Sequence, residues 1–203
     1  TRKLGIDGPE VSAIGLGGMS FTGFFGPTNK VESFECLDAA KDHGITFLDT
    51  AEYYGKGLSE ELIGEYQQFH GHSFNIATKG GIIIGGNRGE NDNSEKALRK
   101  ALEGSLKRLR LEHVELYYIH RRDFSIEIEV VAETLAKFKR EGKIGGFGFS
   151  EIAPSSLRRA HAVHPVTAVQ NEYSLWTRSP ELGMIQTCAE LGVAFVPFSP
   201  LAR

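Results

Sequence analysis

The sequence predicts an α/β fold in which short buried strands alternate with amphipathic helices. Apolar runs typical of buried strands recur along the chain, and stretches with helical spacing separate them. No low-complexity segment or linker interrupts this alternation. Strands that alternate with helices imply parallel pairing with right-handed crossovers. A chain of 203 residues can bury a sizeable core, so we expect one domain over residues 1–203.

Seven apolar runs are the expected strands. In chain order they are residues 13–16, 46–48, 75–78, 114–119, 144–149, 168–170 and 193–198. Six helices are expected between them, and the most regular spans residues 97–109, where apolar residues recur at steps of three and four. Asn93 or Ser94 is its expected N-cap. The patterns of the other five helices include Leu37, Leu62, Val131, Leu157 and Cys188.

The alternation alone fits an open doubly wound sheet or a closed barrel, and the polar residues at strand ends decide between them. Asp49 directly follows the second run, with Tyr54 in the loop after it, while Lys79 and His120 directly follow the third and fourth. Each has an ordinary structural explanation when taken singly, as a turn residue or a solvated group. Charged residues after apolar strands are costly unless they are paired, and barrel active sites lie at this face. We therefore predict a (β/α)8 TIM barrel.

The chain is shorter than a complete barrel of this kind. A complete eight-unit barrel takes about 250 residues. The last expected strand is the seventh, and it ends at residue 198 of 203. We therefore expect an incomplete barrel, seen through strand seven, with its C-terminal part missing.

The residue types at the strand ends suit one chemistry. A tyrosine with a pKa near 10 is a weak acid at neutral pH, but a neighbouring ammonium stabilises the phenolate. An aspartate keeps that ammonium in place, and a histidine can hydrogen-bond to a substrate carbonyl oxygen. Asp49, Tyr54, Lys79 and His120 are therefore candidates for an acid that protonates an oxygen while hydride reaches the carbon.

At these residues the sequence resembles the aldo-keto reductase superfamily, over essentially the whole chain. The pattern Asp-Thr-Ala-x-x-Tyr-Gly occupies residues 49–55, followed by SEELIGEY, and the Thr-Lys pair occupies residues 78–79. The segment SLKRLRLEHVELYYIHR resembles the approach to the fourth strand. The resemblance, to plant and microbial NADPH-dependent members, implies a catalytic tetrad of Asp49, Tyr54, Lys79 and His120. It also implies reduction of aldehydes or ketones, with hydride from NADPH and the proton from Tyr54.

The same resemblance implies positions for the cofactor. Ser150 and Gln170 match the side chains that hold the nicotinamide carboxamide, and Phe198 stands where a ring stacks on the nicotinamide. Glu151 departs from the family pattern, which has Asn there. The remaining implied cofactor positions are Gly18, Met19, Ser20, Asp49, Ser199, Leu201 and Arg203.

The composition indicates which classes of binding partner and which cell compartment to expect. A net charge of −3 gives no reason to expect nucleic acid or an anionic membrane, and no apolar run approaches the roughly 18 residues that span a bilayer. We expect Cys36 and Cys188 to be reduced core thiols, which fits the cytoplasm, and we expect no metal site. The expected partner is a small carbonyl substrate, and the sequence does not indicate an oligomeric state.

Two alternatives stay open at the level of the sequence. The superfamily includes channel-type regulatory β-subunits that bind NADPH with little turnover, and such subunits can keep the tetrad. The chain as given could also bind no cofactor. Turnover of simple aldehydes would favour the enzyme, and cofactor titration would test the second alternative.

Overall fold

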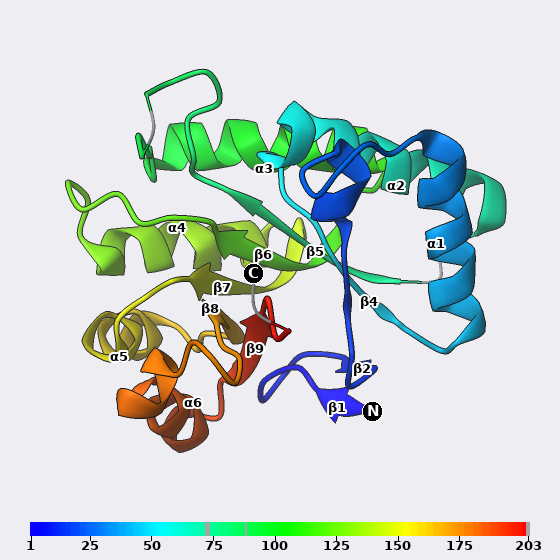
Figure 1. Cartoon of the computed structure of the whole chain (residues 1–203). Coiled ribbons are helices and arrows are strands. Elements are labelled where there is room, and N and C mark those ends of the chain that lie inside the picture. Colours follow the sequence, from blue (N-terminus) through cyan, green and yellow to red (C-terminus); the bar gives the residue numbers. More distant parts are fainter. Residues whose placement is uncertain (72–73, 88, 202–203) are drawn as a thin grey trace.

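A computed structural model describes residues 1–71, 74–87 and 89–201, and its main feature is a curled sheet of seven parallel strands in chain order. Each strand pairs with the next (Figure 1). The strands are β3 (Leu16–Gly17), β4 (Phe47–Asp49), β5 (Asn75–Gly80), β6 (Val114–Ile119), β7 (Ile144–Ser150), β8 (Ala168–Glu172) and β9 (Ala194–Phe198). The parallel α/β sheet expected from the alternation is confirmed.

Six α-helices connect these strands within the described part of the chain, and they lie along the outside of the curled sheet (Figure 1). They are α1 (Lys30–Asp42), α2 (Leu58–His70), α3 (Glu95–Leu109), α4 (Ile128–Arg140), α5 (Pro154–Val163) and α6 (Met184–Leu191). Three short 3₁₀ helices are η1 (Gly18–Thr22), η2 (Tyr54–Gly57) and η3 (Ser179–Leu182). No helix among the described residues is long and apolar enough to cross a membrane.

Alternating side chains of the strands divide the core into two clusters. In β6, Leu116 and Tyr118 belong to the inner cluster, while Tyr117 and Ile119 face the helices and join the larger outer one. An antiparallel hairpin, β1 (Arg2–Lys3) and β2 (Glu10–Val11), supplies further residues to the inner cluster. The sequence did not predict this hairpin, because strands of two residues carry no readable periodicity.

Two expectations about the N-terminal part were wrong. The first strand was expected at residues 13–16, but only Leu16 and Gly17 pair with β4, and Ile14 is exposed. Cys36 was expected in the core, yet it lies on the exposed face of α1, whose buried positions include Leu37 and Ala40. Cys188 is buried as expected.

The helices are fixed by local contacts that the sequence partly predicts. Ser94 is the N-cap of α3, because its hydroxyl accepts a hydrogen bond from the Ala97 N–H at 3.3 Å. Asn93 instead holds the loop after β6, where its amide donates to the Arg121 carbonyl. Helices α2 and α3 approach closely at Gly64, where a Cβ would lie 2.3 Å from the Arg108 carbonyl oxygen.

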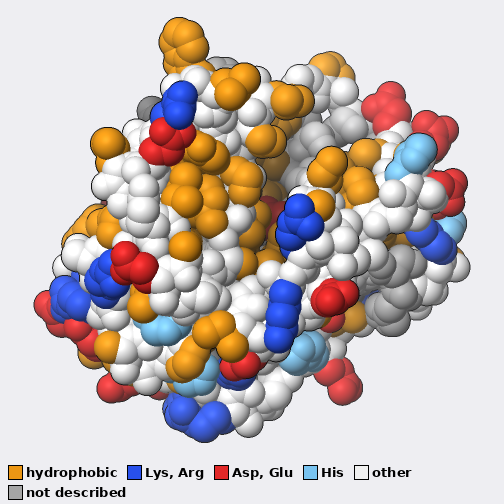
Figure 2. Space-filling view, turned by 90° about the horizontal axis from the view of Figure 1, so that it is seen from below, with side chains coloured by type: hydrophobic (Ala, Val, Ile, Leu, Met, Phe, Trp, Pro, Cys, Tyr) orange, Lys and Arg blue, Asp and Glu red, His pale blue; other side chains and the backbone are white. Residues whose placement is uncertain are grey.

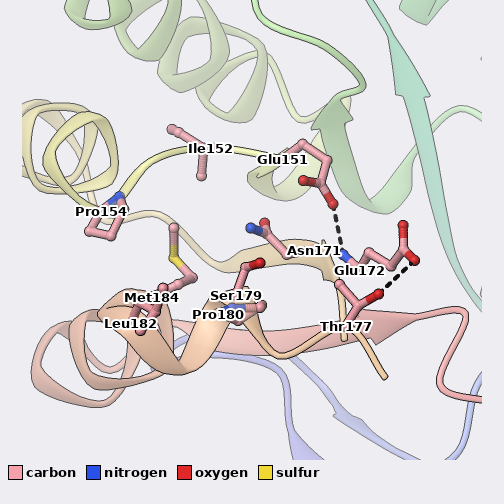
Figure 3. Close-up of a pocket in the computed structure, with 10 residues that line it drawn as sticks. All are labelled: Glu151, Ile152, Pro154, Asn171, Glu172, Thr177, Ser179, Pro180, Leu182 and Met184. Atoms are coloured by element: carbon pink, nitrogen blue, oxygen red, sulfur yellow. Dashed lines mark hydrogen bonds between the residues drawn. The ribbon is translucent and has the colours of Figure 1, made fainter. Parts of the chain in front are cut away.

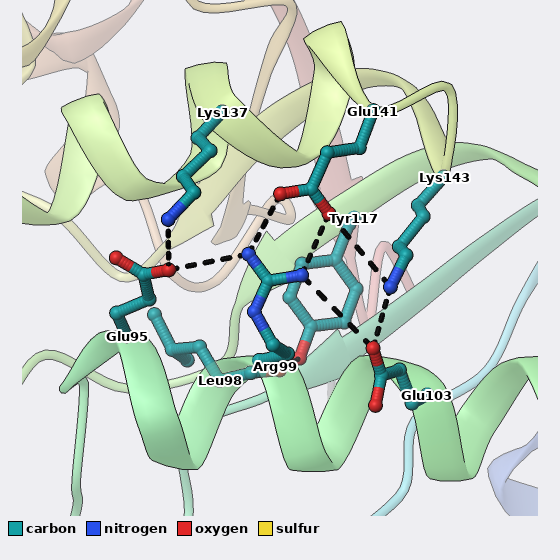
Figure 4. Close-up of polar contacts among 8 residues, drawn as sticks. All are labelled: Glu95, Leu98, Arg99, Glu103, Tyr117, Lys137, Glu141 and Lys143. Atoms are coloured by element: carbon teal, nitrogen blue, oxygen red, sulfur yellow. Dashed lines mark hydrogen bonds and ion pairs between the residues drawn. The ribbon is translucent and has the colours of Figure 1, made fainter.

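Charged side chains link the outer faces of α3 and α4 (Figure 4). The Arg99 guanidinium donates to both carboxylate oxygens of Glu141, at 2.6 and 2.8 Å, and pairs with Glu95 on its own helix. Lys137 on α4 also pairs with Glu95. These contacts lie at the surface, so the two helices are held mainly by the buried side chains beneath them.

The face seen from below in Figure 2 is hollowed near its centre, and hydrophobic side chains gather beside the hollow. Strands β3 and β9 are the two edges of the curled sheet.

Candidate active site

The four candidate catalytic residues come together at the carboxyl end of the sheet. Asp49 is the last residue of β4, Lys79 lies near the end of β5, and His120 directly follows β6. Tyr54 opens the 3₁₀ helix η2 in the loop after β4. Parallel strands end at one edge, so strand position alone brings these side chains to one place.

The ammonium of Lys79 is the centre of the site. Its side chain is fully buried, and its three hydrogens match three acceptors. Nζ donates to Asp49 Oδ1, to the Thr50 carbonyl oxygen at 2.9 Å and, over a longer 3.4 Å, to the Tyr54 hydroxyl. Burial alone disfavours the charge, but attraction by Asp49 and Tyr54 outweighs it, and the pKa of Lys79 is raised. The lysine is therefore a charged donor.

The His120 ring packs edge-on against the ring of Tyr54. The two ring centroids are 5.7 Å apart and the ring planes are 85° apart, and the Tyr53 ring also packs edge-on against His120. Burial, and then the charges of Lys79 and Arg121, hold the pKa of His120 well below its ordinary value. The imidazole is therefore neutral, and its Nδ1 has no hydrogen-bond partner within the described part of the chain.

Ser150 and Gln170 lie side by side next to this group. They are paired residues of β7 and β8, and both side chains are almost fully buried. Gln170 Nε2 donates to Asp49 Oδ2 at 2.8 Å, so both oxygens of the aspartate are used. The Ser150 hydroxyl accepts a hydrogen bond from Arg121. Neighbouring buried polar groups of this kind fit a ligand carboxamide, which needs both a donor and an acceptor.

The segment after β3 lies beside Asp49. Gly18, Met19 and Ser20 form most of η1, and Gly17 pairs with Asp49 in the sheet. The Ser59 hydroxyl donates to the Gly18 carbonyl at 2.8 Å, and a Cβ at Gly18 would lie 2.7 Å from that hydroxyl oxygen. A glycine is therefore needed for this close approach of backbone to α2.

The positions after β9 are less enclosed. Phe198 ends the strand, and its carbonyl accepts from the Tyr173 N–H at 3.3 Å. Ser199 has a φ of 49°, in the left-handed region, and Leu201 is exposed. Arg203 lies outside the described residues.

Glu151 does not join the group around Lys79. Its φ is 56°, and its carboxylate accepts from the Glu172 N–H at 2.7 Å. It lines a pocket of about 320 Å³ between the ends of β7 and β8 and η3 (Figure 3). The other lining residues are Ile152, Pro154, Asn171, Glu172, Thr177, Ser179, Pro180, Leu182 and Met184. This pocket contains none of the four candidate catalytic residues.

Two contacts were not predicted from the sequence. The Thr50 carbonyl is one of the three acceptors around Lys79, and Arg121 donates to Ser150 on the next strand. Backbone acceptors carry no residue signature, and Arg121 lies 29 positions from its partner. Among the described residues, no group of three or more His, Cys, Asp or Glu side chains is placed to hold a metal ion.

Comparisons with known proteins agree with the predicted resemblance. Residues 13–203 match the model of the aldo/keto reductase family. The chain is 44% identical, over 99% of its length, to a protein from Glycine max named "Probable aldo-keto reductase 1", and it spans 59% of that relative.

Solved structures give the same result. A glycerol dehydrogenase, AKR11B4 from Gluconobacter oxydans, is 29% identical with a TM-score of 0.87, over 97% of this chain and 62% of its own. The aldo-keto reductase AKR11C1 from Bacillus halodurans, in a holo form, is 29% identical with a TM-score of 0.85, over 97% and 64%. The chain thus spans about three fifths of these relatives.

Proposed function

Because this chain belongs to the aldo/keto reductase family, we propose that it reduces aldehydes and ketones to alcohols with NADPH. The family consists of nicotinamide-dependent oxidoreductases that act on carbonyl groups. In this proposal Tyr54 gives the proton, and Asp49, Lys79 and His120 support it. The observation that carries the proposal is the buried Lys79 ammonium, which contacts both Asp49 and the Tyr54 hydroxyl.

The bound cofactor supplies the hydride, and the chain's own residues manage the proton. As the Tyr54 hydroxyl releases its proton to the carbonyl oxygen, negative charge develops on the phenolate. The Lys79 N–H that points at this oxygen from 3.4 Å stabilises that charge. Asp49 and the Thr50 carbonyl hold the other two hydrogens of the ammonium, so its direction is set before the reaction.

His120 orients the substrate in this proposal. A neutral imidazole has one N–H donor, and that donor can hydrogen-bond to the carbonyl oxygen that receives the proton. The edge-on packing of the His120 and Tyr54 rings keeps the two groups close enough to reach one oxygen. The low pKa of His120 supports a hydrogen-bonding role over a role as a second charged acid.

Other side chains are proposed to hold the cofactor. Ser150 and Gln170 are buried polar neighbours that fit the nicotinamide carboxamide. Phe198 ends β9, where its ring face can stack on the nicotinamide. The further proposed cofactor positions are Gly18, Met19, Ser20, Asp49, Ser199, Leu201 and Arg203.

The test compares three proteins for consumption of NADPH with a panel of aldehydes: wild type, Tyr54→Phe and Tyr53→Phe. We expect Tyr54→Phe to lose about 10²–10⁴-fold in turnover while it binds NADPH normally, since general acid catalysis contributes that much. Tyr53→Phe removes a hydroxyl from the neighbouring, exposed ring and is the matched control. Full activity of Tyr54→Phe would contradict the assignment of the proton donor.

Three finer statements belong to the same proposal. A preference for NADPH over NADH rests on the resemblance to NADPH-dependent members, and parallel titration with both cofactors tests it. The relatives are named as reductases and a dehydrogenase, and this favours an enzyme over a channel-type regulatory subunit. We also propose the cytoplasm as the location, and fractionation of cells would test this.

A further inference from the structure

Arg121 links two strands at the edge of the candidate site. It directly follows His120 after β6, and its Nη1 donates to the His120 carbonyl oxygen at 2.6 Å. The same nitrogen donates to the Ser150 hydroxyl oxygen at 3.0 Å, at the end of β7. One guanidinium nitrogen therefore joins the backbone of the histidine to a side chain on the cofactor side.

This contact fixes the role that the Ser150 hydroxyl can play. A guanidinium has donors and no acceptor, so the serine oxygen must accept from it. The serine hydrogen is then free to point at another acceptor. Because Ser150 is 4% exposed and paired in the sheet with Gln170, few directions remain for that hydrogen.

We propose that Arg121 is a positioning residue that presets the Ser150 hydroxyl as a donor to the carbonyl oxygen of the nicotinamide carboxamide. The same guanidinium ties the His120 backbone to this arrangement. The inference rests on the proposed function, in which Ser150 holds the carboxamide. It assigns to Arg121 no contact with the substrate or the cofactor.

The neighbouring arginine makes different contacts. Arg122 Nη1 donates to the Ser156 hydroxyl of α5 at 3.0 Å, and its guanidinium lies 4.9 Å from the exposed Phe124 ring. These contacts direct the Arg122 guanidinium to α5 and to Phe124. Arg122→Met removes the same charge one residue away and is therefore the matched control for Arg121→Met.

The first measurement is a double-mutant cycle in which the affinity for NADPH is measured from the fluorescence of the nicotinamide. We expect Ser150→Ala and Arg121→Met each to weaken binding by about tenfold, the size of one well-placed hydrogen bond. The double variant should bind no more weakly than Ser150→Ala alone, because Arg121 acts through the serine. Arg122→Met should bind like wild type.

The second measurement needs no cofactor and follows the His120 imidazole by NMR titration. The charged group on β5 that faces this ring is Lys79, and the tyrosine rings against it are Tyr53 and Tyr54. Arg121 adds a second positive charge, so Arg121→Met should raise the pKa of His120 while Arg122→Met leaves it in place. An unchanged His120 pKa in Arg121→Met would show that the guanidinium is not held beside the histidine, and this result would contradict the proposed position of Arg121.

The outcomes separate this inference from the proposed function. Additive effects of Ser150→Ala and Arg121→Met, or normal NADPH binding by Arg121→Met, would overturn the role of Arg121 and leave the reductase proposal intact. A non-additive cycle in a protein that reduces no carbonyl would support Arg121 and count against the activity. A wild type that binds no NADPH would overturn both.

Discussion

We expect the substitution Arg108→Met to lower the free energy of unfolding by about 3 kcal/mol. Arg108 lies near the end of α3, and its Nε donates to Glu60 Oε2 at 2.7 Å. The Glu60 side chain is fully buried, and its other oxygen accepts from the Thr78 hydroxyl, one residue before Lys79. Without the arginine, a carboxylate stays buried with one neutral partner.

The magnitude follows from the burial of the two partners. Removing one member of a buried ion pair costs roughly 3–5 kcal/mol, because the remaining charge is left uncompensated. Arg108 keeps 21% of its side chain exposed, so water offsets part of this cost and we take the lower end. For a domain of this size, that loss corresponds to a melting temperature about 6–12 °C lower.

The assay is equilibrium unfolding in urea, with a second variant that relieves the uncompensated charge. Glu60→Gln keeps an acceptor for Thr78 without a charge, so we expect Arg108→Met with Glu60→Gln to be more stable than Arg108→Met alone. Lys107→Met, on the exposed side of the same helical turn, is the control and should change stability by less than about 0.5 kcal/mol. A double variant no more stable than Arg108→Met would refute the reasoning.

Two further predictions concern stability. Gly64→Ala should cost about 1–3 kcal/mol in urea unfolding, because its Cβ would lie 2.3 Å from the Arg108 carbonyl; an unchanged midpoint would show that α2 can shift. His120 stays neutral in the folded protein while the unfolded chain takes up a proton below pH 6.5, so stability should fall by about 1.4 kcal/mol per pH unit there. His120→Gln should remove that part of the slope, and an unaltered slope would contradict the low pKa.

Most of the fold could be predicted because the period of apolar residues differs between strands and helices. The runs at β6 and β7, and the helical spacing of α3, gave element types that the structure confirms. The same signal failed at residues 13–16, where an edge strand is held by two paired residues. It also misplaced Cys36, because α1 buries only part of one face.

For the candidate site, the sequence predicts the positions of residues but not the contacts between their side chains. A residue that ends a parallel strand or directly follows it has its place fixed by the strand, so Asp49 and His120 could be placed without any knowledge of side-chain contacts. The contacts between side chains could not be predicted. In the segment HRRD the two arginines look alike, yet one reaches Ser150 on β7 and the other reaches Ser156 on α5. The two arginines can be told apart only when the positions of β7 and α5 beside the end of β6 are known.

The contacts also show how the two sides of the site depend on each other. Asp49 uses one oxygen for the Lys79 ammonium and the other for the Gln170 amide, so it connects the lysine beside the proposed proton donor to the residues of the proposed cofactor site. Arg121 makes a second connection, from the His120 backbone to the Ser150 hydroxyl. A shift of Gln170 would therefore reach Lys79 through Asp49, and a shift of Ser150 would reach the His120 backbone through Arg121. Under the proposed function, a carboxamide bound between Ser150 and Gln170 would contact both of these connections.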